Sequence, residues 1–351
     1  MPFTPGFILA EAQTLLTLAG LSEDTVPNSP PPPPPTGWQM TFQSPPLGPF
    51  ENLFQLWQNN DVPGQYAVAI RGTIEDTGSI IEDLASLMIP ASFQITVDQL
   101  TISFQFAAEP ATGVKPAGVH LGFTVGALFL LLDPDHLGTS SILGQLAALP
   151  AGSEVYITGH SQGAAVAALV ASYLHYPNYL TSALPPLHHK TYVFAQPKPG
   201  NDQYSWDFEQ AVASQGLGIR VTNPLDWVPQ VPLTIQFLQD VNTPNPLSGH
   251  GLFGGATARA AVSAAVALSE ARALDWAMSQ FVNLPALIGA KGAPQGLLPG
   301  AAPLSIMLSL NFMPAGGEIA LVPDPAFSIP DDPFSQHHVA TYQALLTQTF
   351  P

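Results

Sequence analysis

The chain has 351 residues, of which 46% are hydrophobic and only 9% charged, and its formal net charge is −17 from 25 acidic and 8 basic side chains. So few cations exclude the basic surface that nucleic-acid phosphates require and disfavour anionic membranes, whereas a neutral lipid or a small ester stays open as a substrate. The absence of cysteine excludes disulfides, thiolate zinc sites and a cysteine nucleophile.

Residues 1–44 are predicted to form an N-terminal extension to a larger domain of residues 45–351. The extension begins with a short helix around residues 7–18 and contains six consecutive prolines, residues 30–35, which favour polyproline II. A stiff spacer or surface strap is the preferred interpretation of this segment, and a docking motif for a proline-recognition module is the alternative. The start of the chain shows no recognisable signal peptide, and no segment is predicted to span a membrane, so the location stays open.

From about Phe50 the pattern alternates between strands and helices. Strands are predicted at residues 66–70, 154–158, 191–195, 219–222 and 316–322, and a hairpin or long edge strand at 93–106. Helices are predicted at residues 123–149, with a break near Pro134, at 164–173 and at 339–349. This alternation predicts an α/β fold with a mostly parallel central sheet flanked by helices. Residues 241–316, rich in Gly, Ala, Leu and Pro, are predicted to form a cap or insertion.

The segment Gly159-His160-Ser161-Gln162-Gly163 follows a β-branched run and precedes an Ala-rich helix. A strand-to-helix turn this tight strains the backbone of its central residue, and side chains at the glycine positions would collide with neighbouring elements. The turn therefore predicts Ser161 as a nucleophile raised to the carboxyl edge of the sheet. A small-residue turn without chemistry is the alternative.

A serine nucleophile needs a base, and the base needs an orienting acid. Asp226 follows the strand at 219–222 through a short loop, so its carboxylate is predicted at the same sheet edge. Downstream of it, His250 lies in a Gly-rich loop with no strand before it, whereas His337 and His338 follow the last strand. One of this pair is predicted to be the base.

Two donors are expected to stabilise an oxyanion. The first is the backbone N–H of Gln162, at the start of the helix after Ser161. The second is expected at Gly72-Thr73, at the end of an earlier strand, from the backbone N–H of Thr73 aided by its hydroxyl.

Together these segments resemble the fungal-type lipase family, lipase class 3, of the α/β-hydrolase superfamily. The matching blocks are AIRGT (69–73) with IEDL (81–84), VHLGF (119–123), GHSQG (159–163), FAQPKPGN (194–201) and NPLDWVP (223–229). The resemblance covers roughly residues 65–345. It implies an α/β-hydrolase catalytic domain, a mobile lid, ester hydrolysis without a cofactor or metal, a Ser161-Asp226-histidine triad, and Thr73 and Gln162 as oxyanion donors. The family's H-x-x-x-x-Y pattern fits His337 with Tyr342 and favours His337 over His338.

The chain departs from the family pattern at two places. The usual Trp at the lid start is absent, because Ile80-Ile81 precedes Glu82-Asp83, and the 111 residues from Asp226 to His337 form a long interval. The acidic run Glu75, Asp76, Glu82 and Asp83 is predicted to be a solvated face, with an acidic lid that repels anionic interfaces as the alternative.

The predicted function is a carboxylic ester hydrolase, first of all a triacylglycerol lipase that acts on neutral acyl esters. An esterase of short, soluble esters is the second possibility, and a non-catalytic binding module with a hydrolase fold is the third. The sequence leaves the oligomeric state and the natural ester open.

Overall fold

The computed structural model describes residues 3–23, 33–48, 50–72, 87–97, 100–133, 138–177, 180–236, 240–242, 307 and 309–351. Thr73, the acidic run 75–83, Pro30–Pro32 and most of the predicted insertion 241–316 lie outside these residues.

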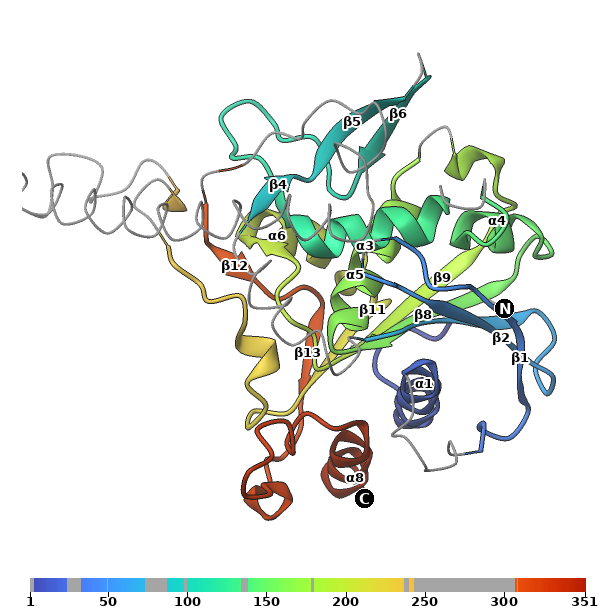
Figure 1. The fold of residues 1–351 in the computed structure, drawn as a ribbon, viewed down its shortest axis with the longest axis vertical. Helices are drawn as coiled ribbons and strands as arrows, with labels where there is room; N and C mark the ends of the chain where they lie inside the picture. Colours follow the sequence, from blue (N-terminus) through green and yellow to red (C-terminus); the bar gives the residue numbers. More distant parts are fainter. Residues whose placement is uncertain are drawn as a thin grey trace, which may run out of the picture.

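The central sheet has seven strands in the order β1-β2-β3-β8-β9-β11-β13 (Figure 1). Their bounds are β1 Trp38–Gln43, β2 Phe54–Asn59, β3 Gln65–Ile70, β8 Glu154–His160, β9 His188–Phe194, β11 Gly218–Thr222 and β13 Gly317–Ala320. Strands β3 to β13 run parallel, and β1 and β2 add an antiparallel edge. The predicted α/β architecture, a mostly parallel central sheet flanked by helices, is confirmed.

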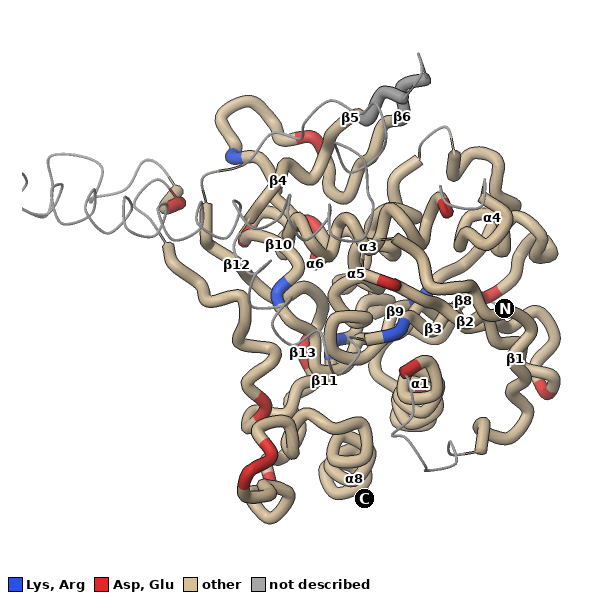
Figure 2. Tube along the Cα trace, in the orientation of Figure 1, with Lys and Arg blue, Asp and Glu red and all other residues tan. Residues whose placement is uncertain are grey.

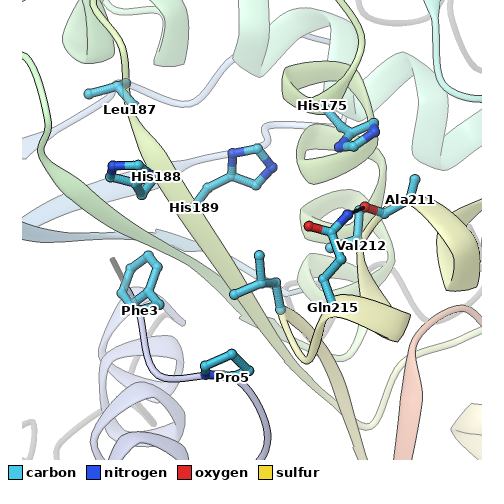
Figure 3. Close-up of a pocket in the computed structure, with 10 residues that line it drawn as sticks. Phe3, Pro5, His175, Leu187, His188, His189, Ala211, Val212 and Gln215 are labelled. Atoms are coloured by element: carbon cyan, nitrogen blue, oxygen red, sulfur yellow. Dashed lines mark hydrogen bonds between the residues drawn. The ribbon is translucent and has the colours of Figure 1, made fainter. Parts of the chain in front are cut away.

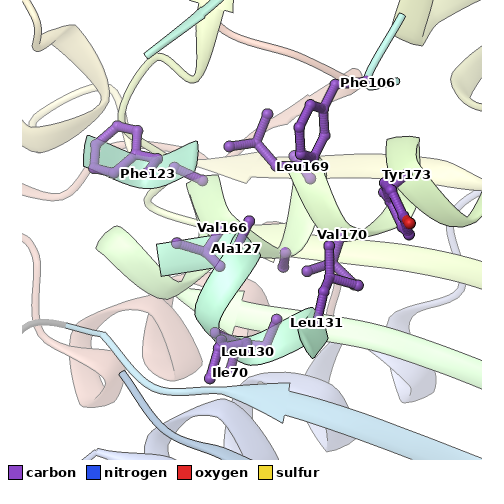
Figure 4. Close-up of a cluster of buried hydrophobic side chains, with 14 of the residues drawn as sticks. Ile70, Phe106, Phe123, Ala127, Leu130, Leu131, Val166, Leu169, Val170 and Tyr173 are labelled. Atoms are coloured by element: carbon purple, nitrogen blue, oxygen red, sulfur yellow. The ribbon is translucent and has the colours of Figure 1, made fainter. Parts of the chain in front are cut away.

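Helices cover both faces of this sheet (Figure 1). One face carries α3 Leu121–Leu132, α4 Ile142–Ala147, α5 Gln162–His175 and α6 Asp202–Ala211, and the other carries α1 Leu9–Ser22 and α8 Val339–Thr349. Figure 4 shows the larger core cluster, in which side chains of α3 and α5 lie together with Ile70 of β3 and Phe106. Helix α5 is almost entirely small or apolar, and its burial from Gly163 to Tyr173 follows from that composition.

A hairpin and a second sheet lie beside the central sheet. Strands β5 Ser92–Val97 and β6 Leu100–Gln105 form the predicted hairpin. Four short strands, β4 Met88–Pro90, β7 Gly118–His120, β10 Gly200–Asn201 and β12 Phe312–Met313, form a sheet that the sequence analysis did not predict. Strand β12 belongs to the end of the predicted insertion, so this end pairs with the body of the protein; the cap itself stays a prediction. Short 3-10 turns occupy Thr181–Ala183, Ala213–Gln215, Val228–Gln230 and Pro325–Phe327.

Helix α1 lies along β8 on the face that it shares with α8. Near its start, Glu11 accepts hydrogen bonds from Lys190 Nζ at 2.6 Å, Tyr192 OH at 2.7 Å and Tyr156 OH at 2.7 Å. Lys190 is fully buried, so Glu11 supplies the countercharge that such a position requires. The division between residues 44 and 45 stays a prediction about domains, and within the described residues both α1 and β1 belong to the layers of the central sheet.

Charged residues are sparse along the described part of the trace (Figure 2). None of the five lysines and arginines among the described residues is exposed, and Arg71, Lys190 and Arg220 are buried. No helix within the described ranges has the length and apolar character needed to cross a bilayer.

Candidate active site

Ser161 stands between the last residue of β8 and the first residue of α5. Its backbone has φ 56° and ψ −133°, a conformation that L-residues rarely adopt, and its N–H donates to the carbonyl of Phe194 at 3.1 Å. A Cβ atom at Gly159 would overlap the main chain of Gly163, and one at Gly163 would overlap the carbonyl of Ile70. The two glycines therefore leave room for a turn that places Ser161 at the carboxyl edge of the parallel strands.

Asp226 and His337 meet at the same edge, although 111 residues separate them. The Nδ1–H of His337 donates to Asp226 Oδ2 at 2.7 Å, and both side chains are buried. This hydrogen bond leaves Nε2 of His337 as the basic nitrogen of the neutral ring. His338, the alternative in the sequence analysis, instead lies 2.8 Å from Asp332 Oδ2 with 51% of its side chain exposed.

Further hydrogen bonds hold the Asp226 carboxylate. Tyr342 OH donates to Oδ2 at 2.9 Å, and the N–H of Val228 donates to Oδ1 at 3.0 Å. Burial and the charge of Asp226 raise the pKa of Tyr342 well above 10, so the phenol stays protonated and remains a donor. The sequence analysis named Tyr342 only as part of a family pattern, and its contact with Asp226 explains that spacing.

His160 and Glu23 belong to the same group of side chains, and sequence reasoning missed both. His160 directly precedes Ser161, and its ring lies 4.5 Å from the His337 ring between centroids. Its Nδ1 lies 2.8 Å from Glu23 Oε1, and its Nε2 lies 2.8 Å from the main-chain carbonyl of His337. Glu23 follows directly after α1, so the N-terminal helix contributes a carboxylate to this edge of the sheet.

The two imidazoles have opposite pKa shifts. For His337, burial lowers the pKa and the neighbouring His160 lowers it further, which outweighs the opposing effects of Asp226 and Glu23. For His160, burial lowers the pKa, but the charge and hydrogen bond of Glu23, together with Asp226 and the His337 carbonyl, outweigh burial and the net shift of the pKa is upward. The arrangement thus favours a neutral His337 beside a protonated His160.

One predicted oxyanion donor, Gln162, directly follows Ser161, and the other, Thr73, follows a residue that lies beside Ser161. Gln162 is the first residue of α5, at the positive end of the helix dipole. Thr73 lies outside the described residues, but Gly72 directly before it is described, and a Cβ atom there would come within 3.4 Å of Ser161 Cβ. The chain entering Thr73 therefore passes immediately beside Ser161.

Apolar side chains border the His337 side of the site. The rings of Trp227 and Phe334 are 5.3 Å apart between centroids, and Phe334 is 6.0 Å from the His337 ring. Each keeps 37% of its surface exposed, and Leu225 next to Asp226 keeps 42%. We call Leu225, Trp227 and Phe334 the apolar rim.

A cavity of about 340 Å³ lies at the opposite end of the strands (Figure 3). Its walls include three histidines, His175 from α5 and His188 and His189 from the start of β9, together with Phe3 and Pro5 from the N-terminal segment. No set of three or more potential metal ligands is arranged to hold an ion within the described part of the chain. The cavity contains none of the residues around Ser161.

Comparisons with known proteins address the region that carries the turn. Residues 67–236 match the family model for Lipase (class 3). The chain is similar in structure to a lipase from Rhizopus microsporus var. chinensis, with 24% identity, a TM-score of 0.37 and 56% of each chain covered. It is also similar to the triacylglyceride lipase of Rhizomucor miehei, with 18% identity, a TM-score of 0.43, and 64% of this chain and 74% of that one covered.

The similarity to M37 lipase has 20% identity and a TM-score of 0.42 and covers 55% of each chain, so the match spans only about half the length of M37 lipase and of the Rhizopus lipase. No curated protein matches the sequence significantly. The family match includes Ser161 and Asp226 and ends before His337.

Proposed function

We propose that the protein is a serine carboxylic ester hydrolase, a lipase that acts on neutral acyl esters such as triacylglycerols. The observation that carries the proposal is the 2.7 Å hydrogen bond from His337 to the buried Asp226, at the sheet edge where the strained turn presents Ser161. A nucleophile, an imidazole and an orienting carboxylate in this order are the components of a serine hydrolase triad.

In the proposed reaction, His337 Nε2 takes the hydroxyl proton of Ser161 as Oγ attacks the ester carbonyl. Asp226 holds the Nδ1–H side of the ring and stabilises the imidazolium that forms. His337 then gives the proton to the alkoxide leaving group, which departs as the alcohol and leaves an acyl-serine. Because the pKa of His337 is lowered, the resting base is neutral at pH 7, as this step requires.

Water completes the cycle. His337 takes a proton from a water molecule, the resulting hydroxide attacks the acyl-serine, and the proton returns to Ser161 Oγ as the carboxylic acid leaves. The N–H of Gln162 and the N–H and hydroxyl of Thr73 are proposed to stabilise the oxyanion in both halves of the reaction. The position of Gly72 beside Ser161 supports the role of Thr73.

The apolar rim and the charge distribution support a neutral, apolar acyl group in the substrate. Trp227 and Phe334 have partly exposed rings on the His337 side of the site. These rings favour contact with an apolar acyl chain over contact with a charged group. No exposed cation among the described residues is available to attract an anionic headgroup.

The test is a series of p-nitrophenyl esters from acetate to palmitate, hydrolysed by the wild type, Ser161→Ala and a control. Ser214→Ala is a suitable control because Ser214 is exposed and lies after α6, away from the site. We expect rates that rise with acyl length in the wild type and in the Ser214 variant, and no hydrolysis above background in Ser161→Ala.

The remaining outcomes separate the alternatives. A preference for acetate that is also lost in Ser161→Ala keeps the mechanism but makes the protein an esterase of short esters. Hydrolysis that persists in Ser161→Ala, or a wild type without activity, overturns the proposal.

A further inference from the structure

His160 is buried between two groups that can only accept hydrogen bonds. On one side is the carboxylate of Glu23, 2.8 Å from Nδ1, and on the other is the main-chain carbonyl of His337, 2.8 Å from Nε2. A neutral imidazole carries one N–H and could satisfy only one of these contacts. Both contacts are satisfied together when His160 is an imidazolium and Glu23 a carboxylate, so the geometry itself indicates an ion pair between a buried imidazolium and a partly exposed carboxylate.

The carbonyl that His160 binds belongs to the proposed catalytic base. His337 follows Phe334 in a tight turn, where its N–H donates to the Phe334 carbonyl at 2.7 Å, and α8 begins two residues later. The contact from His160 therefore fixes the main chain of His337 directly, while Asp226 fixes its ring. With only 3% of its surface exposed, His160 has little access to water that could replace Glu23 as a partner.

We propose that Glu23 is a positioning residue for the catalytic base: its carboxylate holds His160 in the doubly protonated form, and His160 anchors the main-chain carbonyl of His337. This inference rests on the proposed function. It assigns α1, outside the segment that matches the lipase family, a part in the chemistry of the site.

Four charged or titratable groups surround His160, and they come from three elements. They are Glu23 after α1, His337 before α8, Asp226 after β11, and Tyr342 in α8, whose ring meets His160 edge-on at 5.8 Å. The guanidinium of Arg71 donates to the carbonyl of Glu51. Within this set, Glu23 has the largest upward effect on the pKa of His160, so changing Glu23 isolates the proposed role.

Glu23→Gln removes the charge and keeps the shape. The Gln amide can donate to Nδ1 of a neutral His160, whose Nε2–H can still donate to His337, so the variant is expected to fold. Glu109→Gln is the matched control, because it removes the same charge from an exposed loop position.

The first readout is a pH titration of the histidine ring nitrogens by NMR in the full chain carrying Ser161→Ala. His160→Gln and His337→Asn variants assign the signals. We expect His160 to keep both protons at pH 7 in the Ser161→Ala background and to lose one at a pH lower by on the order of one unit when Glu23→Gln is added. If the pKa of His160 is the same with and without the Glu23→Gln change, the inference is overturned.

The second readout is the pH profile of kcat/KM on a p-nitrophenyl ester. Without Glu23 the His160 cation is lost, and because that cation lowers the pKa of His337 by more than Glu23 raises it, the pKa of His337 should rise. We expect the acid limb of the Glu23→Gln profile to move to higher pH by on the order of half a unit, with kcat reduced and KM unchanged. Glu109→Gln should follow the wild type, and a Glu23→Gln profile identical to that of the control overturns the inference.

The two readouts also separate this inference from the proposed function. If the wild type hydrolyses no ester, the proposed function fails, whereas the titration still decides whether Glu23 sets the charge of His160. If the wild type is active and the titration shows no effect of Glu23→Gln, only the positioning role fails.

Discussion

The backbone of Ser161 has a positive φ, which is unfavourable for a residue with a Cβ atom. The strand before Ser161 and the helix after it impose this conformation. Residues held in such regions cost about 1–3 kcal/mol, and the surrounding structure must offset that cost. Removing the side chain is therefore expected to relieve the strain and to raise the free energy of unfolding.

Two variants that both lack the hydroxyl expose this strain. Ser161→Ala keeps the Cβ atom, whereas Ser161→Gly removes it, so the glycine variant should be more stable by about 1 kcal/mol even though glycine gains entropy in the unfolded chain. Urea unfolding of the two variants measures the difference. An alanine variant at least as stable as the glycine variant would show that the turn is not strained through its side chain.

At the scale of single residues, the sequence could predict only features that are defined by residues close together in the chain. The strand-to-helix turn can be predicted because Gly159, Ser161 and Gly163 lie within five residues between a strand pattern and a helix pattern. The Glu23 contact with His160 spans 137 residues and has no local signature, so no spacing rule could have found it. His160 belongs to the GHSQG motif, but its hydrogen-bond partners Glu23 and His337 are far from it in the sequence and can be identified only in the folded chain.

Element lengths explain why the shortest strands were not predicted. The helix predicted at residues 339–349 agrees with α8, and the central parallel strands have enough β-branched or apolar residues to be recognised. Strands β10 and β12 have two residues each, which is too short for any periodicity. Their sheet is instead held by contacts such as Asn201 Oδ1, which accepts from the N–H groups of Gly118 and Tyr204. These contacts give a structural reason for Asn201 at the end of the lipase-like block FAQPKPGN.

The second residue of strand β9, His189, is a histidine whose protonation should oppose folding. Burial, with the nearby His175 and His188, lowers the pKa of His189 to about 4 from the usual 6.5. The unfolded chain therefore binds this proton more readily, so the stability is complete above pH 6.5 and declines as the pH falls towards 4. Since the cavity admits some solvent, the loss should be about 1–2 kcal/mol, less than the full shift implies.

Urea unfolding of the wild type and His189→Asn at pH 7 and pH 4.5 checks this expectation. The variant should lose less stability between the two pH values than the wild type does. Equal losses would mean that His189 is not the group that titrates, and His188→Asn, at an exposed neighbouring position, serves as the control.

On the scale of the molecule, the sheet was predictable and the place of the N-terminal segment was not. Composition and alternation indicate an α/β core, but they do not reveal that α1 packs on β8 or that Glu11 pairs with the buried Lys190. That contact joins residues 179 positions apart. The helix was predicted to belong to an extension that also contains the six prolines; in the fold its apolar residues pack in the core cluster shared with α8.

The edge of the sheet that carries Ser161 is assembled from residues 23, 160–161, 226 and 337, so most of the chain must be in place before the group is complete. Contacts between such distant positions form late, because each requires closing a long loop. After dilution from urea, the helical circular dichroism signal should therefore return before ester hydrolysis does. Stopped-flow circular dichroism and activity sampled along the same time course measure the two rates, and coincident recovery would show that the site forms together with the helices.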